Sequence, residues 1–170
     1  VCALINPWNY PLLQMVGKVA PALAAGCTMI VKPAEQTPIQ DIIMAEIVDS
    51  VGLPGGVFNL LTGVGSEIGP KMSSHPLVDM VSFTGSTSSG ISVAMNAAPT
   101  IKRVCQEMGG KSAFIIGEGA DLHAAIKYGV DNVMLNTGQT CDALTRMLVP
   151  RAQYKEAIDI ATRCANEHVV

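Results

Sequence analysis

Short apolar runs rich in β-branched residues alternate with longer stretches of helical periodicity in the first half of the chain. The apolar runs cover residues 1–5, 28–31, 57–61 and 80–83. The clearest helical stretches between them cover residues 12–24 and 37–51. Strands that alternate with helices in this way are typical of βαβ units, in which parallel strands form a sheet with helices on both faces. The pattern therefore predicts an α/β fold built on a parallel sheet.

The stretch 37–51 carries the strongest helix signals. Thr37 is placed to cap the helix, Pro38 suits the first helical position, and Gln40 completes a capping box. The isoleucines of this stretch share one face, at positions 39, 43 and 47. We therefore predict a helix over residues 37–51 with Thr37 as its N-cap.

A glycine pair at 109–110 separates this region from a second one. A new strand-like run follows at 113–116, and Asp121 can cap a helix after it. The apolar residues of that helix are Leu122, Ala125, Ile126, Val130, Val133 and Met134. The final helical stretch, 153–168, has an apolar stripe of Tyr154, Ala157, Ile158, Ala161 and Cys164. We expect two partial domains, residues 1–109 and 110–170, the second being the start of another α/β domain.

Composition and charge exclude several classes of protein. The chain has 170 residues, 49% of them hydrophobic, and it begins at Val1 in an apolar strand-like run, so we expect a globular fragment of a longer protein. Its formal net charge is -3 and its 11 basic residues are scattered, which argues against nucleic acid as a partner. The apolar stretch 19–31 is interrupted by Pro21 and Gly26 and is too short to cross a membrane.

The five cysteines form no Cys-x-x-Cys pair, so the pattern favours a reducing compartment, the cytoplasm, over a disulfide framework. The three histidines are scattered among them, and we expect no metal site. We expect Cys2, Cys27, Cys105 and Cys164 to lie in the core, because they occur in strand-like or helical apolar patterns. Cys141 differs, since it follows the loop sequence Gly-Gln-Thr.

Three side chains are candidates for chemistry. Cys141 is a loop thiol that can be presented as a nucleophile, Asn9 offers an amide, and Glu107 offers a carboxylate. Each also has an ordinary interpretation: a buried thiol, a turn residue bonded to its own backbone, and a solvated carboxylate at a strand end. Only their combination favours a catalytic set.

A second group of residues indicates a dinucleotide site. Residues 83–87 lie where a strand turns into a helix, and the N–H groups of a helix N-terminus favour phosphate, so we predict Ser86 as a pyrophosphate contact. Residues 63–69 resemble the Gly-x-Gly-x-x-Gly fingerprint with one residue too many. Taken alone, that second signal is weak.

Six motifs, in this order and spacing, carry a family resemblance. They are PWNYP at 7–11, KPAEQTP at 32–38, GLPGGV at 52–57, FTGST at 83–87, EMGGK at 107–111 and GQTC at 138–141. The sequence resembles the aldehyde dehydrogenase superfamily, in its hydrolytic branch, along essentially its whole length, and it looks like the central fragment of a family chain. The resemblance implies a Rossmann-like cofactor domain followed by the start of a catalytic domain.

The resemblance also implies a mechanism for oxidising an aldehyde to a carboxylic acid. Cys141 attacks the aldehyde, the Asn9 side chain and the Cys141 backbone N–H stabilise the oxyanion, and a thioester forms after hydride transfer. Glu107 is the general base that activates the water which releases the acid.

The implied cofactor is NAD, with NADP disfavoured, because Glu35 beside Lys32 accepts both ribose hydroxyls and repels a 2′-phosphate. A solvated Lys-Glu pair is the ordinary alternative. The implied cofactor-binding residues are Ile5, Pro7, Trp8, Asn9, Lys32, Ala34, Glu35, Gly65, Gly69, Phe83, Gly85, Ser86, Ser89, Glu107 and Gly109. Ser89 departs from the family pattern, since many members have an aliphatic residue beneath the adenine.

Two alternatives stay open. Acyl transfer to coenzyme A is the nearest rival in chemistry, although Glu107 favours hydrolysis. The other is a non-catalytic dinucleotide-binding fragment, because upstream strands and the rest of the catalytic domain are not in this sequence. The resemblance further implies a homo-oligomer, a dimer or tetramer, and leaves the aldehyde unidentified.

Overall fold

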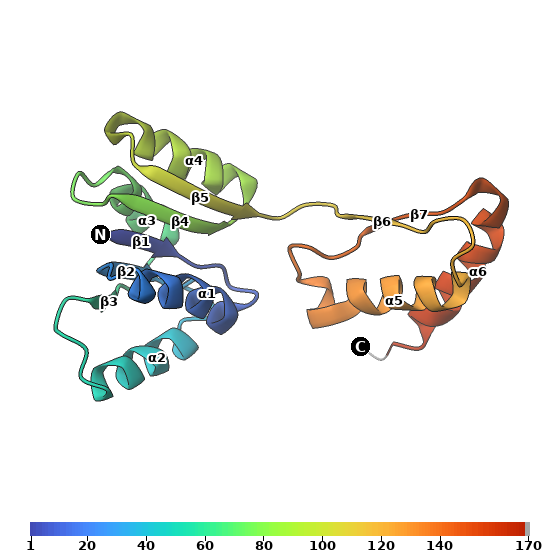
Figure 1. The fold of residues 1–170 in the computed structure, drawn as a ribbon, viewed down its shortest axis with the longest axis horizontal. Helices are drawn as coiled ribbons and strands as arrows, with labels where there is room; N and C mark the ends of the chain where they lie inside the picture. The colour runs from blue at the N-terminus through green and yellow to red at the C-terminus, as the bar shows by residue number, and fades with distance from the viewer. Residues whose placement is uncertain (169–170) are drawn as a thin grey trace. The chain divides into compact units, whose positions relative to one another are not determined.

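The computed structural model describes residues 1–168, which form two compact units (Figure 1). The first unit is Val1–Met108, and the second begins at Gly109. Each unit has its own sheet, helices and core.

The first unit is a five-stranded parallel sheet in the order β3-β2-β1-β4-β5. Its strands are β1 (Cys2–Ile5), β2 (Met29–Lys32), β3 (Phe58–Leu60), β4 (Met80–Gly85) and β5 (Arg103–Met108). The helices that connect them are α1 (Pro11–Ala24), α2 (Ile39–Ser50), α3 (Gly65–Ser74) and α4 (Thr87–Ala97), and the short 3-10 helix η1 (Ala98–Thr100) follows α4. This architecture confirms the predicted α/β fold with a parallel sheet. The strand order reverses between β1 and β4, and ligands of such sheets bind at the carboxyl ends of the strands beside the reversal.

Alternate residues of the strands face two separate hydrophobic clusters. On one face, Ala3 and Ile5 pack with Val81, Phe83 and residues of α3 and α4. On the other face, Cys2 and Leu4 pack with Met15, Val19 and residues of β2. This alternation matters for the site, because it determines which face each polar residue near the strand ends occupies.

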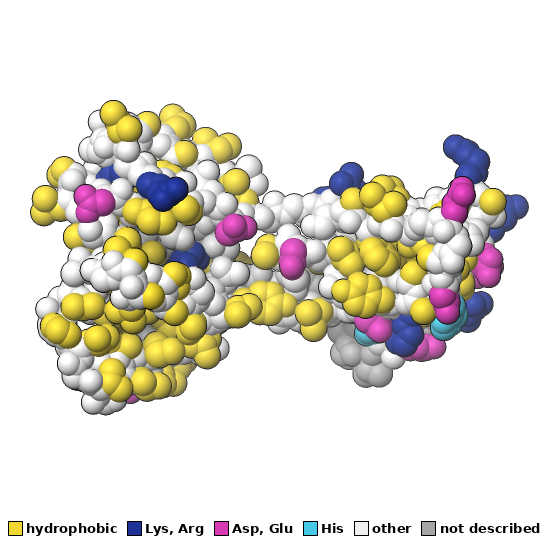
Figure 2. Space-filling view, viewed as in Figure 1, with side chains coloured by type: hydrophobic (Ala, Val, Ile, Leu, Met, Phe, Trp, Pro, Cys, Tyr) yellow, Lys and Arg dark blue, Asp and Glu magenta, His cyan; other side chains and the backbone are white. Residues whose placement is uncertain are grey.

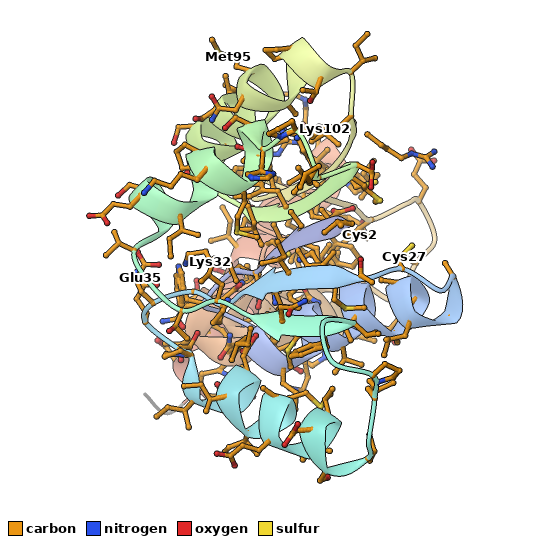
Figure 3. All side chains as sticks on the ribbon, turned by 90° about the vertical axis from the view of Figure 1, so that its left-hand side faces the viewer. Cys2, Cys27, Lys32, Glu35, Met95 and Lys102 are labelled. Carbon is orange, nitrogen blue, oxygen red and sulfur yellow. The ribbon has the colours of Figure 1, made fainter. Side chains whose placement is uncertain are left out.

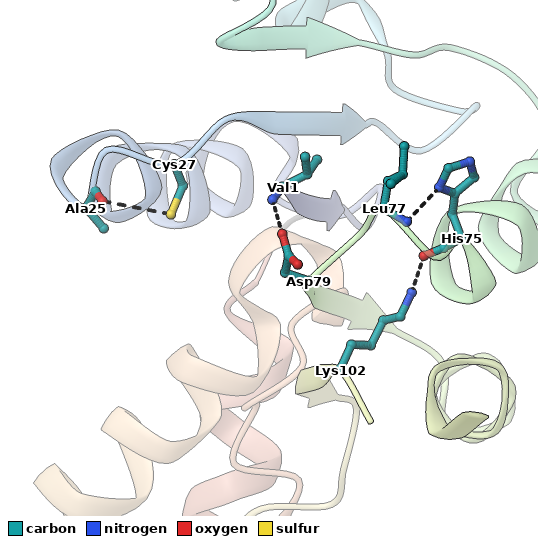
Figure 4. Close-up of polar contacts among 7 residues, drawn as sticks. All are labelled: Val1, Ala25, Cys27, His75, Leu77, Asp79 and Lys102. Atoms are coloured by element: carbon teal, nitrogen blue, oxygen red, sulfur yellow. Dashed lines mark hydrogen bonds and ion pairs between the residues drawn. The ribbon is translucent and has the colours of Figure 1, made fainter. Parts of the chain in front are cut away.

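At the amino ends of the strands, short polar contacts join the segments that lead into them (Figure 4). Val1 bonds to Asp79 before β4, and the Lys102 ammonium before β5 donates to the carbonyl of His75. His75 Nδ1 accepts from the backbone N–H of Leu77 at 3.2 Å. These contacts lie at the amino ends of the strands. The carboxyl ends, on the opposite side of the sheet, are therefore left for the site.

The start of α2 differs from the prediction. Pro38 is the residue before the helix, and no side chain caps it, so the predicted capping box of Thr37 and Gln40 is wrong. The Thr37 hydroxyl instead donates to the carbonyl of Trp8 at 3.2 Å, because a long-range partner competes with the local one. The helix buries Asp41, while its isoleucines are exposed in the apolar patch over α2 in Figure 2, at positions 39, 42, 43 and 47.

The second unit has a two-stranded parallel sheet and two helices. Its elements are β6 (Ala113–Ile115), α5 (Leu122–Met134), the 3-10 turn η2 (Leu135–Gly138), β7 (Arg146–Leu148), η3 (Arg151–Gln153) and α6 (Tyr154–Asn166). Asp121 caps α5 as predicted, since its Oδ1 accepts from the Ala124 N–H at 3.0 Å. The core cluster is Ile116, Leu122, Ile126, Val130, Ala157, Ile160 and Cys164.

Two expectations about burial are wrong. On α6, Tyr154 and Ile158 are exposed and Ile160 is buried, because the face that packs on α5 is rotated from the predicted stripe. Cys105 is exposed on the edge strand β5, so it is not a core cysteine. Cys27 is half-buried and packs against the cluster that contains Cys2 and Leu4.

Candidate functional site

The carboxyl ends of the parallel strands gather polar side chains in the first unit. Lys32, the last residue of β2, has only 2% of its side chain exposed. Its ammonium donates to the carbonyl of Pro33 at 2.7 Å and to Glu35 Oε2 at 3.2 Å (Figure 3). A lysine held in this way is a fixed positive charge at the sheet edge, and it orients the carboxylate beside it.

The Glu35 carboxylate is anchored from a second side as well. Its Oε1 accepts from the backbone N–H of Gly65 at the start of α3, at 3.3 Å. A Cβ at Gly65 would lie 3.4 Å from Oε2 of Glu35, so a larger residue would crowd this contact. Hydrogen bonds from its own backbone N–H and from Gly65, together with Lys32, lower the pKa of Glu35. The lowered pKa keeps the carboxylate ionised at neutral pH. The side chain remains 42% exposed, so a ligand can reach it.

A pocket of about 260 Å³ lies directly at this carboxylate. Its lining residues are Pro33, Ala34, Glu35, Pro38, Thr62, Gly63 and Val64. Apolar side chains form most of the wall, and Glu35 supplies the charge. A pocket of this kind suits a flat apolar ring joined to a pair of hydroxyl groups. The hydroxyl groups can donate hydrogen bonds to the carboxylate.

The N-terminus of α4 lies at the carboxyl end of β4. Ser86 caps this helix, because its Oγ accepts from the Ser89 N–H at 3.2 Å and is also bonded to the Ser89 hydroxyl at 2.9 Å. A Cβ at Gly85 would lie 2.6 Å from the Phe83 ring, so glycine permits the close turn between strand and helix. Here Ser86 works as the helix cap, while the first-turn N–H groups carry the attraction for an anion.

The end of β1 and the segment after it contain several predicted residues. Ile5 is buried on the α3 and α4 face, Pro7 is buried, and Trp8 is 46% exposed. Asn9 is half-buried in the bend that precedes α1. Of the remaining predicted cofactor residues, Gly69 is buried within α3.

Glu107 is an exposed residue near the carboxyl end of β5, and its Cα partner across the sheet is Thr84 of β4. Residues that face each other across parallel strands place their side chains on the same face of the sheet. Gly109, predicted as a cofactor contact, is the first residue of the second unit.

Sequence reasoning missed Lys18, which lies on α1 among these polar groups. Its ammonium donates to Asn6 Oδ1 at 3.1 Å and to Thr84 Oγ1 at 2.8 Å. Burial lowers its pKa to about 8, against the opposing influence of Glu107 and Asp41. A signal was present in the sequence, because Lys18 is the only charged residue among the first 31.

Cys141 belongs to the second unit, in the loop after α5. The residues before it run through the left-handed region, with φ of 51° at Asn136, 58° at Thr137 and 76° at Gly138. Such a conformation is unusual for a β-branched residue such as Thr137 and marks a sharply turned, specific loop. The Thr140 hydroxyl donates to the carbonyl of Leu135 at 3.3 Å, which closes the loop. The Cys141 thiol that follows is half-buried.

The predicted residues are therefore divided between the two units. The first holds Asn9, Glu107 and all the predicted cofactor residues except Gly109, and the second holds Cys141. Among the described residues, no cluster of three or more histidine, cysteine, aspartate or glutamate side chains is arranged to hold a metal ion. No described helix has the length and apolar character needed to cross a membrane.

Comparison with known proteins gives a consistent result. The family model described as "Aldehyde dehydrogenase family" matches residues 1–170. A 3-succinoylsemialdehyde-pyridine dehydrogenase from Pseudomonas sp. is 55% identical over 170 residues, which is 100% of this chain and 36% of that protein. The chain thus spans about a third of the length of the relatives it matches.

Solved structures agree with the sequence match. A cysteine-to-alanine variant of aldehyde dehydrogenase C from Pseudomonas syringae, in complex with NAD+ and octanal, superposes with a TM-score of 0.96 at 49% identity, over 99% of this chain and 35% of that one. A betaine aldehyde dehydrogenase from Staphylococcus aureus, in complex with NAD+, gives a TM-score of 0.95 at 39% identity, over 98% of this chain and 33% of that one.

Proposed function

Since this chain belongs to the aldehyde dehydrogenase family, we propose that it is the part of an NAD-dependent enzyme which binds the cofactor and oxidises an aldehyde to a carboxylic acid. Glu35 carries most of the cofactor part of this proposal. Its carboxylate is held by Lys32 and by the Gly65 N–H at the mouth of an apolar pocket. That arrangement supports binding of an adenosine, with the base against the apolar wall and the ribose hydroxyls donating to the carboxylate.

The residues present fit NAD better than NADP. A 2′-phosphate would bring negative charge against the ionised Glu35, and Lys32, the adjacent cation among the described residues, is already engaged by Pro33 and Glu35. The N-terminus of α4 is suited to the pyrophosphate, and the complexes of two similar enzymes with NAD+ agree with this choice. When bound, the nicotinamide supplies the hydride acceptor.

In the proposed chemistry, the Cys141 sulfur attacks the aldehyde carbon and a carbon–sulfur bond forms. The side-chain N–H of Asn9 and the backbone N–H of Cys141 donate to the oxygen that becomes negative. Transfer of hydride from that carbon to a bound nicotinamide would leave a thioester on Cys141. Glu107 then removes a proton from water, whose oxygen attacks the thioester. The carbon–sulfur bond breaks, which releases the carboxylic acid and restores the Cys141 thiolate. The Glu107 side chain is exposed at a strand end, which suits a group that must exchange protons with water.

The test uses the full-length enzyme that contains this chain. Rapid mixing with aldehyde and NAD should give a burst of NADH equal to the number of sites, followed by release of free acid without coenzyme A. Strict dependence of product formation on coenzyme A would support acyl transfer and overturn hydrolysis. Binding of NAD to the isolated 170 residues without turnover would support the alternative that this chain alone is a non-catalytic binding fragment.

Two further parts of the proposal concern the setting of the enzyme. We infer a cytoplasmic enzyme, because the cysteines of the chain are free. Three of them, Cys27, Cys105 and Cys141, are at least partly exposed, and thiols of this kind persist in a reducing compartment. We also infer a homodimer or homotetramer. Size-exclusion chromatography with light scattering of the full-length enzyme measures this, and a monomer would contradict it.

A further inference from the structure

Helix α2 carries a buried acidic side chain, Asp41, near the C-terminal ends of the strands. Asp41 is 0% exposed, although three isoleucines of the same helix are at least half exposed. Its Oδ1 accepts from the Asn6 amide at 3.4 Å, and its Oδ2 has no hydrogen-bond partner among the described residues. A buried carboxyl that is only partly satisfied is costly, so its placement calls for a physical account.

Asp41 is one end of a chain of side-chain polar contacts that runs from one strand to the next on one face of the sheet. Asn6 links it to Lys18, because Asn6 bonds to Asp41 through Nδ2 and to the Lys18 ammonium through Oδ1. Lys18 in turn donates to Thr84 at 2.8 Å, and the Thr84 hydroxyl lies 3.4 Å from Gln14 Oε1. The chain of contacts thus joins α2, the residue after β1, α1 and β4 through side chains alone.

The register of the strands extends this chain to Glu107. Ile5 of β1 pairs with Phe83 of β4, so Asn6 is level with Thr84, and Thr84 pairs with Glu107 of β5. Continuing the alternation of the strands places Asn6, Thr84 and Glu107 in one row on the face that α1 covers. Lys18 reaches this row from helix α1, and its charge interacts with both Glu107 and Asp41.

We propose that Asp41 is a positioning residue for Glu107: it holds Asn6 and balances the Lys18 cation, which keeps that cation in the polar row that ends at the Glu107 carboxylate. This inference rests on the proposed role of Glu107 as general base. Among the described residues, Lys18 bonds to Asn6 and Thr84, and its charge interacts with the carboxylates of Asp41 and Glu107. Removal of the Asp41 charge leaves Glu107 as the one carboxylate in the described part of the chain that interacts with Lys18, so Lys18 gives up its proton at lower pH.

The experiment compares Asp41→Asn with Asp49→Asn in the full-length enzyme. Asp49 lies on the same helix and is exposed, so its variant controls for a general loss of negative charge. Competitive acetylation across a pH series, read by peptide mass spectrometry with the exposed Lys71 as reference, gives the titration of Lys18. We expect Asp41→Asn to shift the midpoint of Lys18 downward by about one pH unit. Asp49→Asn should leave it in place.

Turnover provides the second measurement. The alkaline limb of the kcat profile in Asp41→Asn should move down by the same one unit, while the NADH burst amplitude stays unchanged. Lys18→Arg keeps a positive charge at every accessible pH, so Asp41→Asn in that background should not move the profile further. Because the double variant is compared with its own parent, this readout stands even if Asp41→Asn lowers thermal stability.

The outcomes separate this inference from the proposed function. If Glu107→Gln slows turnover but Asp41→Asn moves neither the Lys18 titration nor the kcat profile, the role of Asp41 is overturned and that of Glu107 remains. If Glu107→Gln turns over normally, the general-base assignment fails and the positioning role fails with it. A shift in both measurements, absent from Asp49→Asn, supports the inference.

Discussion

The two units of this chain differ in where their polar side chains lie: the first unit buries several of them, and the second, as far as residue 168, keeps them at least partly exposed. The buried polar side chains among the described residues all belong to the first unit, namely Asn6, Lys32, Asp41, Ser73 and Thr84. In the described part of the second unit, the buried side chains are apolar, and the ion pair of Lys127 with Asp131 lies at the surface. The difference follows from architecture, since five parallel strands end at one edge and leave backbone and side-chain polar groups to be satisfied there.

The two units therefore have different physical tasks. The first unit fixes charges and hydrogen-bond donors before a ligand arrives, as the anchored Glu35 shows. The second unit is a small apolar core that supports one loop, whose left-handed backbone at Asn136 and Thr137 presents Cys141. Electrostatic preorganisation in one unit and backbone geometry in the other are therefore the features to test.

Replacement of the thiol should have the largest effect. Cys141→Ser in the full-length enzyme should abolish the NADH burst and lower turnover by about 10³-fold or more, because a serine hydroxyl is a far weaker nucleophile at neutral pH. Stopped-flow absorbance of NADH measures both. A burst of normal amplitude would remove the chemistry from the second unit.

Replacement of the carboxylate should separate the two chemical steps. Glu107→Gln should preserve the burst and slow the steady state by about 10²- to 10³-fold, because the amide cannot accept a proton from the attacking water. Single-turnover and steady-state measurements on the same sample distinguish these steps. Equal loss of burst and steady state would show that Glu107 acts before the thioester forms.

Core truncations should test whether the two units are separate in stability. Ile126→Ala in the second unit and Met15→Ala in the first each remove a side chain that is 0% exposed, and each should cost about 2–5 kcal/mol. Hydrogen exchange measured by mass spectrometry should show lost protection mainly in the unit that carries the substitution. Equal loss of protection in both units would mean that they unfold together.

The buried cation should give the first unit a distinct pH dependence. The pKa of Lys18 is about 8 in the folded protein and 10.5 is the ordinary value, so between these pH values the unfolded chain binds more protons. Stability therefore rises as pH increases from about 8 to 10.5, by about 3 kcal/mol, and the cost of the buried charge is fully present below pH 8. Urea unfolding of Lys18→Met should lack this rise, and a retained rise would contradict the assignment.

The smallest effect is expected at the surface of the second unit. Lys127 lowers the pKa of Asp131 by a hydrogen bond, but both side chains are exposed and screened by solvent. Asp131→Asn should therefore leave the unfolding midpoint at neutral pH unchanged within error. A clear loss of stability would show that the exposed pair contributes more than its exposure indicates.

Local patterns in the sequence determined most of the architecture. Alternation of apolar runs with helical periodicity predicted the parallel sheet, and the Asp121 cap was predicted because it depends on neighbouring residues only. The order and spacing of the six motifs also pointed to the family, which the comparisons then showed. The strands, the helices and the Asp121 cap depend on neighbouring residues, so local patterns in the sequence are enough to predict them.

Only the tertiary structure decided which side of each element faces inward and which partner each polar group finds. The isoleucines of α2 share one face, yet that face is exposed and Asp41 is buried instead. Thr37 donates to the carbonyl of distant Trp8 and does not cap its own helix. Lys18 was an isolated cation in an apolar sequence, and its role depends on residues 12 and 66 positions away, Asn6 and Thr84. Periodicity fixes the relative angles of side chains around a helix, whereas packing against strands far along the chain fixes how the helix is rotated.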